Sequence, residues 1–249
     1  MAPLSTTPAI VLEQVGKRYD LFKHKAFLMK EIFNRLLQKR VARELFWALQ
    51  NVSVSVDVGE SVAIIGRNGA GKSTLLGLVA GTIYPTLGSV SVTGRVSSLL
   101  ELGAGFHPDL TGRENIYLNA SLLGLRKPEV DARFEKIVAF SDLADFIDVP
   151  LRNYSSGMQV RLGFSVAAHT NSEILLVDEV FAVGDRSFQR KCLALIAEFK
   201  AQKKTMVFVG HGVEGLWEIC ERAIWLEQGR VVADGPFVDV LGRYASDVR

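Results

Sequence analysis

The chain has 249 residues, of which 48% are hydrophobic and 22% charged, and it carries a formal net charge of +2. This is the composition of an ordinary globular protein, long enough for one large domain or two small ones, and its weak charge gives no reason to expect a polyanionic partner. The sequence contains no run of about 18 apolar residues that could span a membrane, and its first residues lack the basic region and apolar core of a secretory signal.

The N-terminal part of the chain is predicted to form a strand followed by a basic stretch. Residues 10–15, which read Ile-Val-Leu-Glu-Gln-Val, are typical of a strand, and Tyr19 follows shortly after them. In residues 21–47 the apolar side chains between 27 and 37 fall at helical spacing, and seven basic residues stand against two acidic ones. Such a helix can lie on an anionic membrane surface or dock on a partner, or it can pack on its own sheet with a solvated basic face. The pattern does not separate these interpretations, and we place the basic insertion at about residues 21–45.

A phosphate-binding loop is predicted at residues 66–73, which read Gly-Arg-Asn-Gly-Ala-Gly-Lys-Ser. Residues 48–58 alternate as in a strand, residues 61–65 form a buried strand, and residues 74–80 indicate a helix, so the loop lies between strand and helix as its pattern requires. Glycines at 66, 69 and 71 let backbone N–H groups surround an anion at a helix N-terminus. Lys72 can reach the β- and γ-phosphates of a nucleotide, and the Ser73 hydroxyl can bind Mg²⁺.

The rest of the chain predicts a helical segment set into an α/β protein. Residues 86–88 are expected to form a turn and residues 89–100 further strand. Thr111 and Glu114 have the spacing of a capping box, and the pattern is then mostly helical to residue 168, with breaks at Gly124, Pro128 and Pro150. Strands are expected at 174–177 and 205–209 around a helix at 186–202, and a hairpin at 223–232 turns at residues 228–229. The order indicates an α/β core with an inserted helical lobe.

The two cysteines, Cys192 and Cys220, lack the spacing of a metal site. We expect them to be reduced thiols in the core of a cytosolic protein.

Two acids end the predicted strand at 174–177. Carboxylates at the C-terminal end of a core strand face the crevice where such sheets bind ligands. We expect Asp178 to hold Mg²⁺ directly or through water, and Glu179 to orient and polarise the attacking water. Acids often end strands without a function, but an upstream phosphate loop makes the pair informative.

Residues 154–158, which read Tyr-Ser-Ser-Gly-Met, lie between the phosphate loop and the acidic strand. They resemble the L-S-G-G-Q signature of the ATP-binding-cassette (ABC) ATPases, with three positions substituted. Ser155 and Gly157 keep a hydroxyl and an exposed N–H at a helix start, which suit a phosphate presented from outside. The same residues could simply cap a helix.

The resemblance covers nearly the whole chain and implies further roles. Residues 182–185 match the D-loop and His211 the switch histidine, although its neighbours here are glycines. Tyr19 matches the aromatic residue that stacks on adenine, and Trp47 is the second candidate for that role. Glu101 is nearest to the position of the family's usual glutamine, and its carboxylate could contact Mg²⁺ or water. The resemblance implies that ATP is contacted by the following residues: Tyr19, Gly66, Asn68, Gly69, Gly71, Lys72, Ser73, Thr74, Ser155, Gly157 and Asp185. It assigns catalysis to Glu179, His211 and Lys72, and Mg²⁺ binding to Ser73, Asp178 and Glu101.

The implied fold is a single ABC nucleotide-binding domain over residues 1–249. It would have a P-loop NTPase (RecA-like) core, an antiparallel β subdomain, and an α-helical subdomain at about 112–170. Residues 99–115, 154–158 and 177–185 look most like the polysaccharide exporters of this family, the ATPases of O-antigen, capsule or teichoic-acid export. We expect no C-terminal carbohydrate-binding domain, because the chain stops soon after the core ends.

The expected function is therefore ATP hydrolysis that drives export of a lipid-linked glycan. The expected assembly is a homodimer on the cytoplasmic face of the inner membrane, attached to two copies of a separate permease and without nucleic acid. Two alternatives stay open: an ABC subunit for another exported substrate, such as a drug or lipid, and a soluble ABC ATPase that acts on ribosomes or DNA.

Overall fold

A computed structural model describes residues 7–21, 44–99, 103, 105–178, 185–210 and 219–247, without the side chains of residues 21, 44 and 178. Most of the basic insertion, together with Glu101, Glu179 and His211, lies outside these residues. The insertion's two ends are nevertheless strand, because β1 spans Pro8–Leu21 and β2 spans Glu44–Asp57. Both strands are longer than the sequence predicts, and Tyr19 lies within β1.

The strands form two sheets. The smaller sheet is antiparallel in the order β2-β1-β4, with β4 at Leu87–Val92. The larger has the order β5-β6-β7-β3-β8-β9, and its strands are parallel except for the β8–β9 hairpin. Its strands have the following bounds: β3 Ser61–Ile65, β5 Val96–Ser98, β6 Ile174–Asp178, β7 Thr205–Val209, β8 Arg222–Glu227 and β9 Arg230–Pro236. The turn predicted at residues 86–88 is wrong in part, since Leu87 already opens β4.

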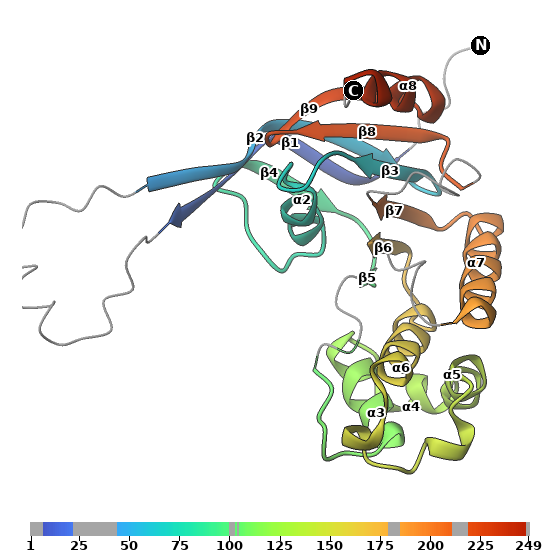
Figure 1. Ribbon diagram of the computed structural model, residues 1–249. Helices are drawn as coiled ribbons and strands as arrows, with labels where there is room; N and C mark the ends of the chain where they lie inside the picture. Colours follow the sequence, from blue (N-terminus) through green and yellow to red (C-terminus); the bar gives the residue numbers. More distant parts are fainter. Residues whose placement is uncertain are drawn as a thin grey trace, which may run out of the picture.

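The far ends of β1 and β2 project beyond the smaller sheet as an arm (Figure 1). Tyr19 pairs with Phe46 there, and the pairing continues to Leu21 and Glu44. A single strand read from its sequence does not reveal such an arm, because the arm's length depends on where its partner strand begins.

The central strands of the larger sheet are buried on both faces, which explains their continuous apolar runs. Alternate residues of β3, β6, β7 and β8 point to opposite sides. One set packs against the antiparallel sheet and the helix α2, Lys72–Val79. The other packs against α6, Ser156–Ala168, and α7, Arg186–Ala201, with help from α8, Phe237–Asp247. The sequence analysis did not predict α8, which packs on β8 through Trp225 and Tyr244.

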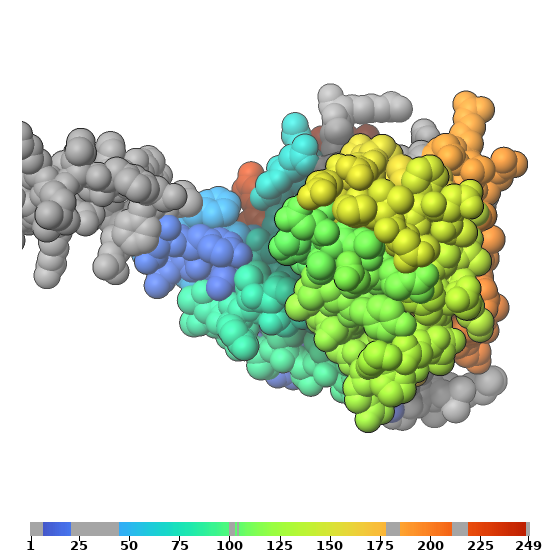
Figure 2. Space-filling view, turned by 90° about the horizontal axis from the view of Figure 1, so that it is seen from below, coloured from blue at the N-terminus to red at the C-terminus, as the bar shows by residue number. Residues whose placement is uncertain are grey.

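The predicted helical lobe is present between β5 and β6. It contains α3 Gly112–Leu122, α4 Lys127–Asp131, α5 Phe134–Ser141 and α6, with short 3-10 turns at Ala144–Phe146 and Leu151–Asn153. The lobe has its own apolar core and gathers into one body when seen from below (Figure 2). The capping box of Thr111 and Glu114 is confirmed. Pro128 lies in the first turn of α4 rather than at a break.

None of the helices in the described part of the chain is long and apolar enough to cross a membrane.

Candidate nucleotide-binding site

The predicted phosphate loop connects β3 to α2. Lys72 is the first residue of α2 and is only 7% exposed. Its Nζ donates hydrogen bonds to the carbonyl oxygens of Gly66, at 2.6 Å, and Arg67, at 3.1 Å. The ammonium group is therefore held against the loop's own backbone, at the helix N-terminus where an anion is favoured. Arg67, Asn68, Gly69 and Ser73 are exposed, and Thr74 is half-buried.

Two glycines of the loop are required for different reasons. A Cβ on Gly66 would lie 2.1 Å from the carbonyl oxygen of Leu226, so the loop passes too close to β8 for any side chain. Gly69 has φ +80°, and a Cβ there would meet nothing within 4 Å. Gly66 therefore allows the loop to pack on the sheet, whereas Gly69 provides backbone curvature on the loop's open side.

The β8–β9 turn supports the loop from behind. The Gly229 N–H donates to the carbonyl of Ala70 at 3.0 Å, and the Gly229 carbonyl accepts from the N–H of Gln50 at 2.7 Å. The sequence predicts this turn but not its contact with the loop, because a hairpin's own pattern says nothing about what its tip touches.

The strand that carries the two acids ends at the same edge of the sheet as the loop. Asp178 of β6 and Ile64 of β3 both pair with Val209 of β7. Since neighbouring strands lie about 4.8 Å apart, the ends of β3 and β6 are about 10 Å apart, with β7 between them. The arrangement brings Asp178 to the level of the phosphate loop, as the sequence predicts. Glu179 and His211 follow directly, but both lie outside the described residues.

The donor set on this edge fits Mg²⁺. Ser73 is exposed on the first turn of α2, and Asp178 ends β6. No cluster of three or more His, Cys, Asp or Glu side chains occurs in the part of the chain that the structure describes. Mg²⁺ needs no such cluster, because it usually takes one or two protein oxygens and completes its shell with phosphates and water.

The predicted signature residues lie at the start of α6. Ser155 is the N-cap, and its Oγ accepts a hydrogen bond from the Met158 N–H at 3.2 Å. Ser155 and Ser156 are exposed, and a Cβ on Gly157 would have only the Ser155 hydroxyl nearby, at 3.9 Å. The capping interpretation is therefore correct, and it leaves the helix start open to an external anion.

Tyr154, which replaces the leucine of the usual signature, belongs to the lobe's core. It is buried, and its hydroxyl donates to the Phe146 carbonyl at 2.6 Å. Burial raises the pKa of this phenol, which therefore stays protonated and serves as a donor.

Asp185 begins α7. Its Oδ1 accepts hydrogen bonds from the N–H groups of Ser187, at 2.8 Å, and Phe188, at 2.9 Å. Hydrogen bonds from the Ser187 hydroxyl and the Phe188 N–H hold the pKa of this carboxyl below its usual value. The structure thus gives Asp185 a capping role, and its contact with nucleotide stays a prediction.

The two aromatic candidates for adenine stacking both lie on the arm. Tyr19 is 37% exposed, with the Lys17 ammonium 5.2 Å from its ring centroid. Trp47 is half-buried beneath the guanidinium of Arg18, at 5.6 Å. Trp47 adjoins Ala48, whose carbonyl lies against the phosphate loop, whereas Tyr19 lies beside Phe46 further along the arm. Stacking by Tyr19 stays a prediction.

Comparison with known proteins agrees with this geometry. Residues 49–182 match the family described as ABC transporter. The chain is 52% identical over 227 residues to the O-antigen export system ATP-binding protein RfbB of Klebsiella pneumoniae, covering 90% of this chain and 92% of that protein. It is 42% identical over 235 residues to the teichoic acids export ATP-binding protein TagH of Levilactobacillus brevis, covering 94% of this chain and 64% of that protein.

The fold prediction is confirmed by likeness to solved cassettes. The dimeric post-hydrolysis structure of the ATP-binding cassette MJ0796 bound to ADP and Pi superposes with a TM-score of 0.71 at 22% identity, covering 91% of this chain and 98% of that one. Residues 49–182, which match the family model, contain the phosphate loop, the signature and the acidic strand. The chain belongs to the ABC transporter family, as an ATP-binding cassette that hydrolyses ATP.

Proposed function

We propose that this chain is the ATP-hydrolysing subunit of an exporter that carries a lipid-linked polysaccharide, such as O-antigen or capsule, across the cytoplasmic membrane. The observation that carries this proposal is the 52% identity, over 90% of the chain, to an O-antigen export ATP-binding protein. The likeness to a teichoic-acid export ATPase supports the same chemical class of substrate.

The segment that resembles the exporters, residues 99–115, has at its end a loop closed by one buried side chain. Asn115 is fully buried, and its Nδ2 donates to the carbonyls of His107, Leu110 and Thr111 at 2.9–3.0 Å. Its Oδ1 accepts from the His107 N–H at 2.7 Å. The side chain thus closes the loop that leads into the lobe, and its amide matches that task in both donors and acceptor.

Within the site, we assign ATP to the phosphate loop and Mg²⁺ to Ser73 and Asp178, with Glu101 as a further oxygen ligand. Lys72 would balance the charge of the β- and γ-phosphates. Glu179 would accept a proton from the attacking water, and His211 would contact the γ-phosphate. These roles rest on the family resemblance together with the common sheet edge reached by β3, β6 and β7.

The proposed assembly is a head-to-tail homodimer at the cytoplasmic face of the inner membrane, bound to two copies of a permease. In such a dimer each nucleotide would lie between Lys72 of one subunit and Ser155 of the other. The exposed, open start of α6 supports this arrangement, because its N–H groups can donate hydrogen bonds to a phosphate from outside the subunit.

The test is export in cells that lack this chain. Surface polysaccharide should disappear while lipid-linked glycan accumulates inside, and the wild-type gene should restore export. The Glu179→Gln variant at equal protein level should not restore it. Normal surface polysaccharide without the chain would contradict glycan export. Accumulation of a drug or another lipid instead would favour a different exported substrate.

A further inference from the structure

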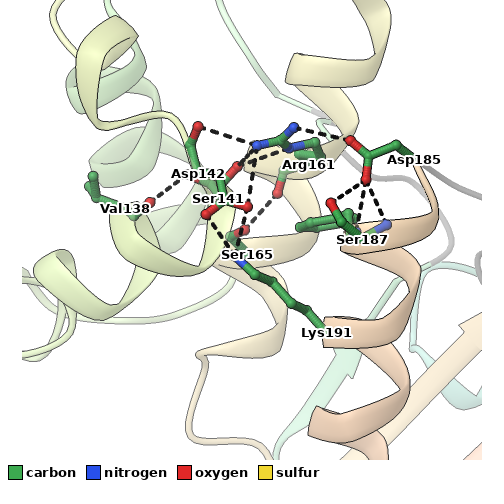
Figure 3. Close-up of polar contacts among 9 residues, drawn as sticks. Val138, Ser141, Asp142, Arg161, Ser165, Asp185, Ser187 and Lys191 are labelled. Carbon is green, nitrogen blue, oxygen red and sulfur yellow. Dashed lines mark hydrogen bonds and ion pairs between the residues drawn. The ribbon is translucent and has the colours of Figure 1, made fainter.

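Three helices meet at a group of charged side chains away from the phosphate loop (Figure 3). We call it the three-helix junction and define it by Asp142 at the C-cap of α5, Arg161 in α6, Asp185 at the N-cap of α7, and Lys191 in α7. Arg161 lies between the two carboxylates, and its side chain is only 18% exposed. It is therefore shielded enough from solvent for its interactions to have a measurable effect.

Arg161 donates hydrogen bonds to the backbone carbonyls at the end of α5. Its Nε donates to the Ser141 carbonyl at 2.9 Å, and an η nitrogen donates to the same oxygen at 2.5 Å and to the Asp142 carbonyl at 3.2 Å. The last carbonyls of a helix lack partners within the helix, so the guanidinium supplies the donors that they need. This contact ties α6 to α5 within the lobe.

Arg161 also faces the beginning of α7. Its other η nitrogen lies 3.8 Å from Oδ2 of Asp185, while Oδ1 of the same carboxylate caps the helix. Its guanidinium lies 5.5 Å from the ring centroid of Phe188. The planar guanidinium therefore contacts the end of α5 and the start of α7 through different nitrogens. A lysine ammonium has one nitrogen and lacks this geometry.

The three-helix junction adjoins, through Arg161 and Phe188, an aromatic cluster that joins the lobe to the sheet core. Phe188 packs edge-on against Phe140 of α5, at 5.6 Å, and Phe164 of α6, at 5.7 Å. Phe188 is fully buried. The start of α7 is thus packed on the lobe's helices by apolar contact, and Arg161 supplies the charged contact at the rim.

Arg161 lies on the same helix as Ser155, which is predicted to act on a partner's nucleotide, and it faces Asp185, which is predicted to contact nucleotide. Ser155 lies six residues before Arg161 on α6, a rise of about 9 Å. Asp185 ends the segment that follows Asp178 and Glu179. We infer that Arg161 is a positioning residue for the composite ATP site, holding the signature at Ser155 and the D-loop end at Asp185 in one fixed relation. This inference rests on the proposed head-to-tail dimer.

The consequence is that closure of the dimer moves both elements together. If Arg161 only stabilised the lobe, its loss would lower the thermal midpoint without a specific effect on dimerisation. If it positions the composite site, its loss will impair dimerisation and turnover even when the subunit is folded and binds nucleotide, because the phosphate loop belongs to the other part of the molecule.

The test compares Arg161→Met and Arg161→Lys with Arg113→Met. Arg113 is a matched control, since it also lies in the lobe, pairs with a carboxylate, Asp148, at 2.7 Å, and lies over a phenyl ring, that of Phe134, at 4.8 Å. It contacts no part of α7 among the interactions described. Dimerisation is measured by size exclusion with ATP in the Glu179→Gln background, and turnover by phosphate release from the otherwise wild-type subunit.

Arg161→Met should leave nucleotide affinity of the monomer within about twofold and lower kcat about 10- to 100-fold, with loss of the ATP-dependent dimer. Arg161→Lys keeps the charge but cannot span both contacts, so its kcat should fall about tenfold. Arg113→Met should match the wild type. The dimer fraction is normalised to the nucleotide-binding fraction, which reports folded protein.

Dimerisation and turnover of both Arg161 variants equal to those of Arg113→Met would overturn the inference. If Arg161→Met does not fold, Arg161→Lys decides by the same criterion. Failure of the proposed function is a separate result, because a wild-type subunit that turns over ATP and dimerises, yet exports no glycan, leaves the role of Arg161 intact.

Discussion

Replacing Gly66 or Gly69 with alanine separates the structural role of the phosphate loop from its binding role. Alanine at position 69 adds a methyl group with no atom within 4 Å, so its cost is that of left-handed backbone, about 1–2 kcal/mol. Alanine at position 66 would place its Cβ 2.1 Å from the Leu226 carbonyl oxygen and 3.2 Å from the Cβ of Ala70. Since Leu226 is held in β8 by its pairing with Val231, the strand cannot give way without breaking that pairing. We expect a cost of about 3–5 kcal/mol, in the range of severe core substitutions.

The assay is thermal unfolding together with titration of a fluorescent ATP analogue. For a chain of this size, 1 kcal/mol corresponds to about 2–4 °C, so Gly69→Ala should lower the midpoint by about 2–8 °C and Gly66→Ala by about 6–20 °C. Gly69→Ala should nevertheless lose at least about tenfold in nucleotide affinity, because its methyl group would occupy the side of the loop that the phosphates approach. Equal loss of stability in the two variants would refute the contact argument at Gly66. Unchanged affinity in Gly69→Ala would refute the assignment of the loop's open side.

Four further outcomes are expected. Lys72→Ala should abolish phosphate release and weaken nucleotide binding, because the bound phosphates lose a fixed cation; normal turnover would contradict the site. Glu179→Gln should keep ATP binding, slow hydrolysis about 10²- to 10⁴-fold and trap a dimer visible by size exclusion. Ser155→Arg should spare ATP binding but block hydrolysis at the partner's site, which mixed dimers with one wild-type subunit would report. Burial raises the pKa of the Cys192 and Cys220 thiols to about 12, so at pH 8 a thiol reagent should label native protein at least about 100-fold more slowly than unfolded protein, and fast native labelling would contradict their burial.

The elements around the phosphate loop could be predicted well from the sequence because their signals are local. The run at 61–65 is apolar from Val62 onward and is followed by a glycine, and β3 occupies those five residues. The capping box at Thr111 and Glu114 is likewise a pattern of four neighbouring residues that specifies its own hydrogen bonds. In both cases the physical cause lies within the segment that carries the pattern.

The features that the sequence did not reveal depend on partners distant in the chain. Residues 17–21 extend β1 by pairing with residues 44–49, and the charged side chains of Lys17, Arg18 and Asp20 give no separate strand signal. The helix α8 is recognisable afterwards by Phe237, Val240, Leu241 and Tyr244 at helical spacing, which pack on the core of the larger sheet. The contact of Arg161 with Asp185 joins residues of two helices separated by the acidic strand, and charge pattern along either helix does not indicate it.

The candidate site is divided between the sheet, with α2, and the helical lobe. A signal from bound ATP must therefore pass between these two parts. Lys72 and Ser73 begin α2, which packs on the sheet that contains β6, and such a close-packed core deforms little. Ser155 caps the first helix turn of α6, in a lobe that has its own apolar core. Phe140, Phe164 and Phe188 connect the lobe to α7, whose N-cap is Asp185. If Arg161 positions the composite site as inferred above, a change at the start of α7 would reach the signature helix α6 through these contacts. That path crosses the three-helix junction, where a single guanidinium contacts both sides.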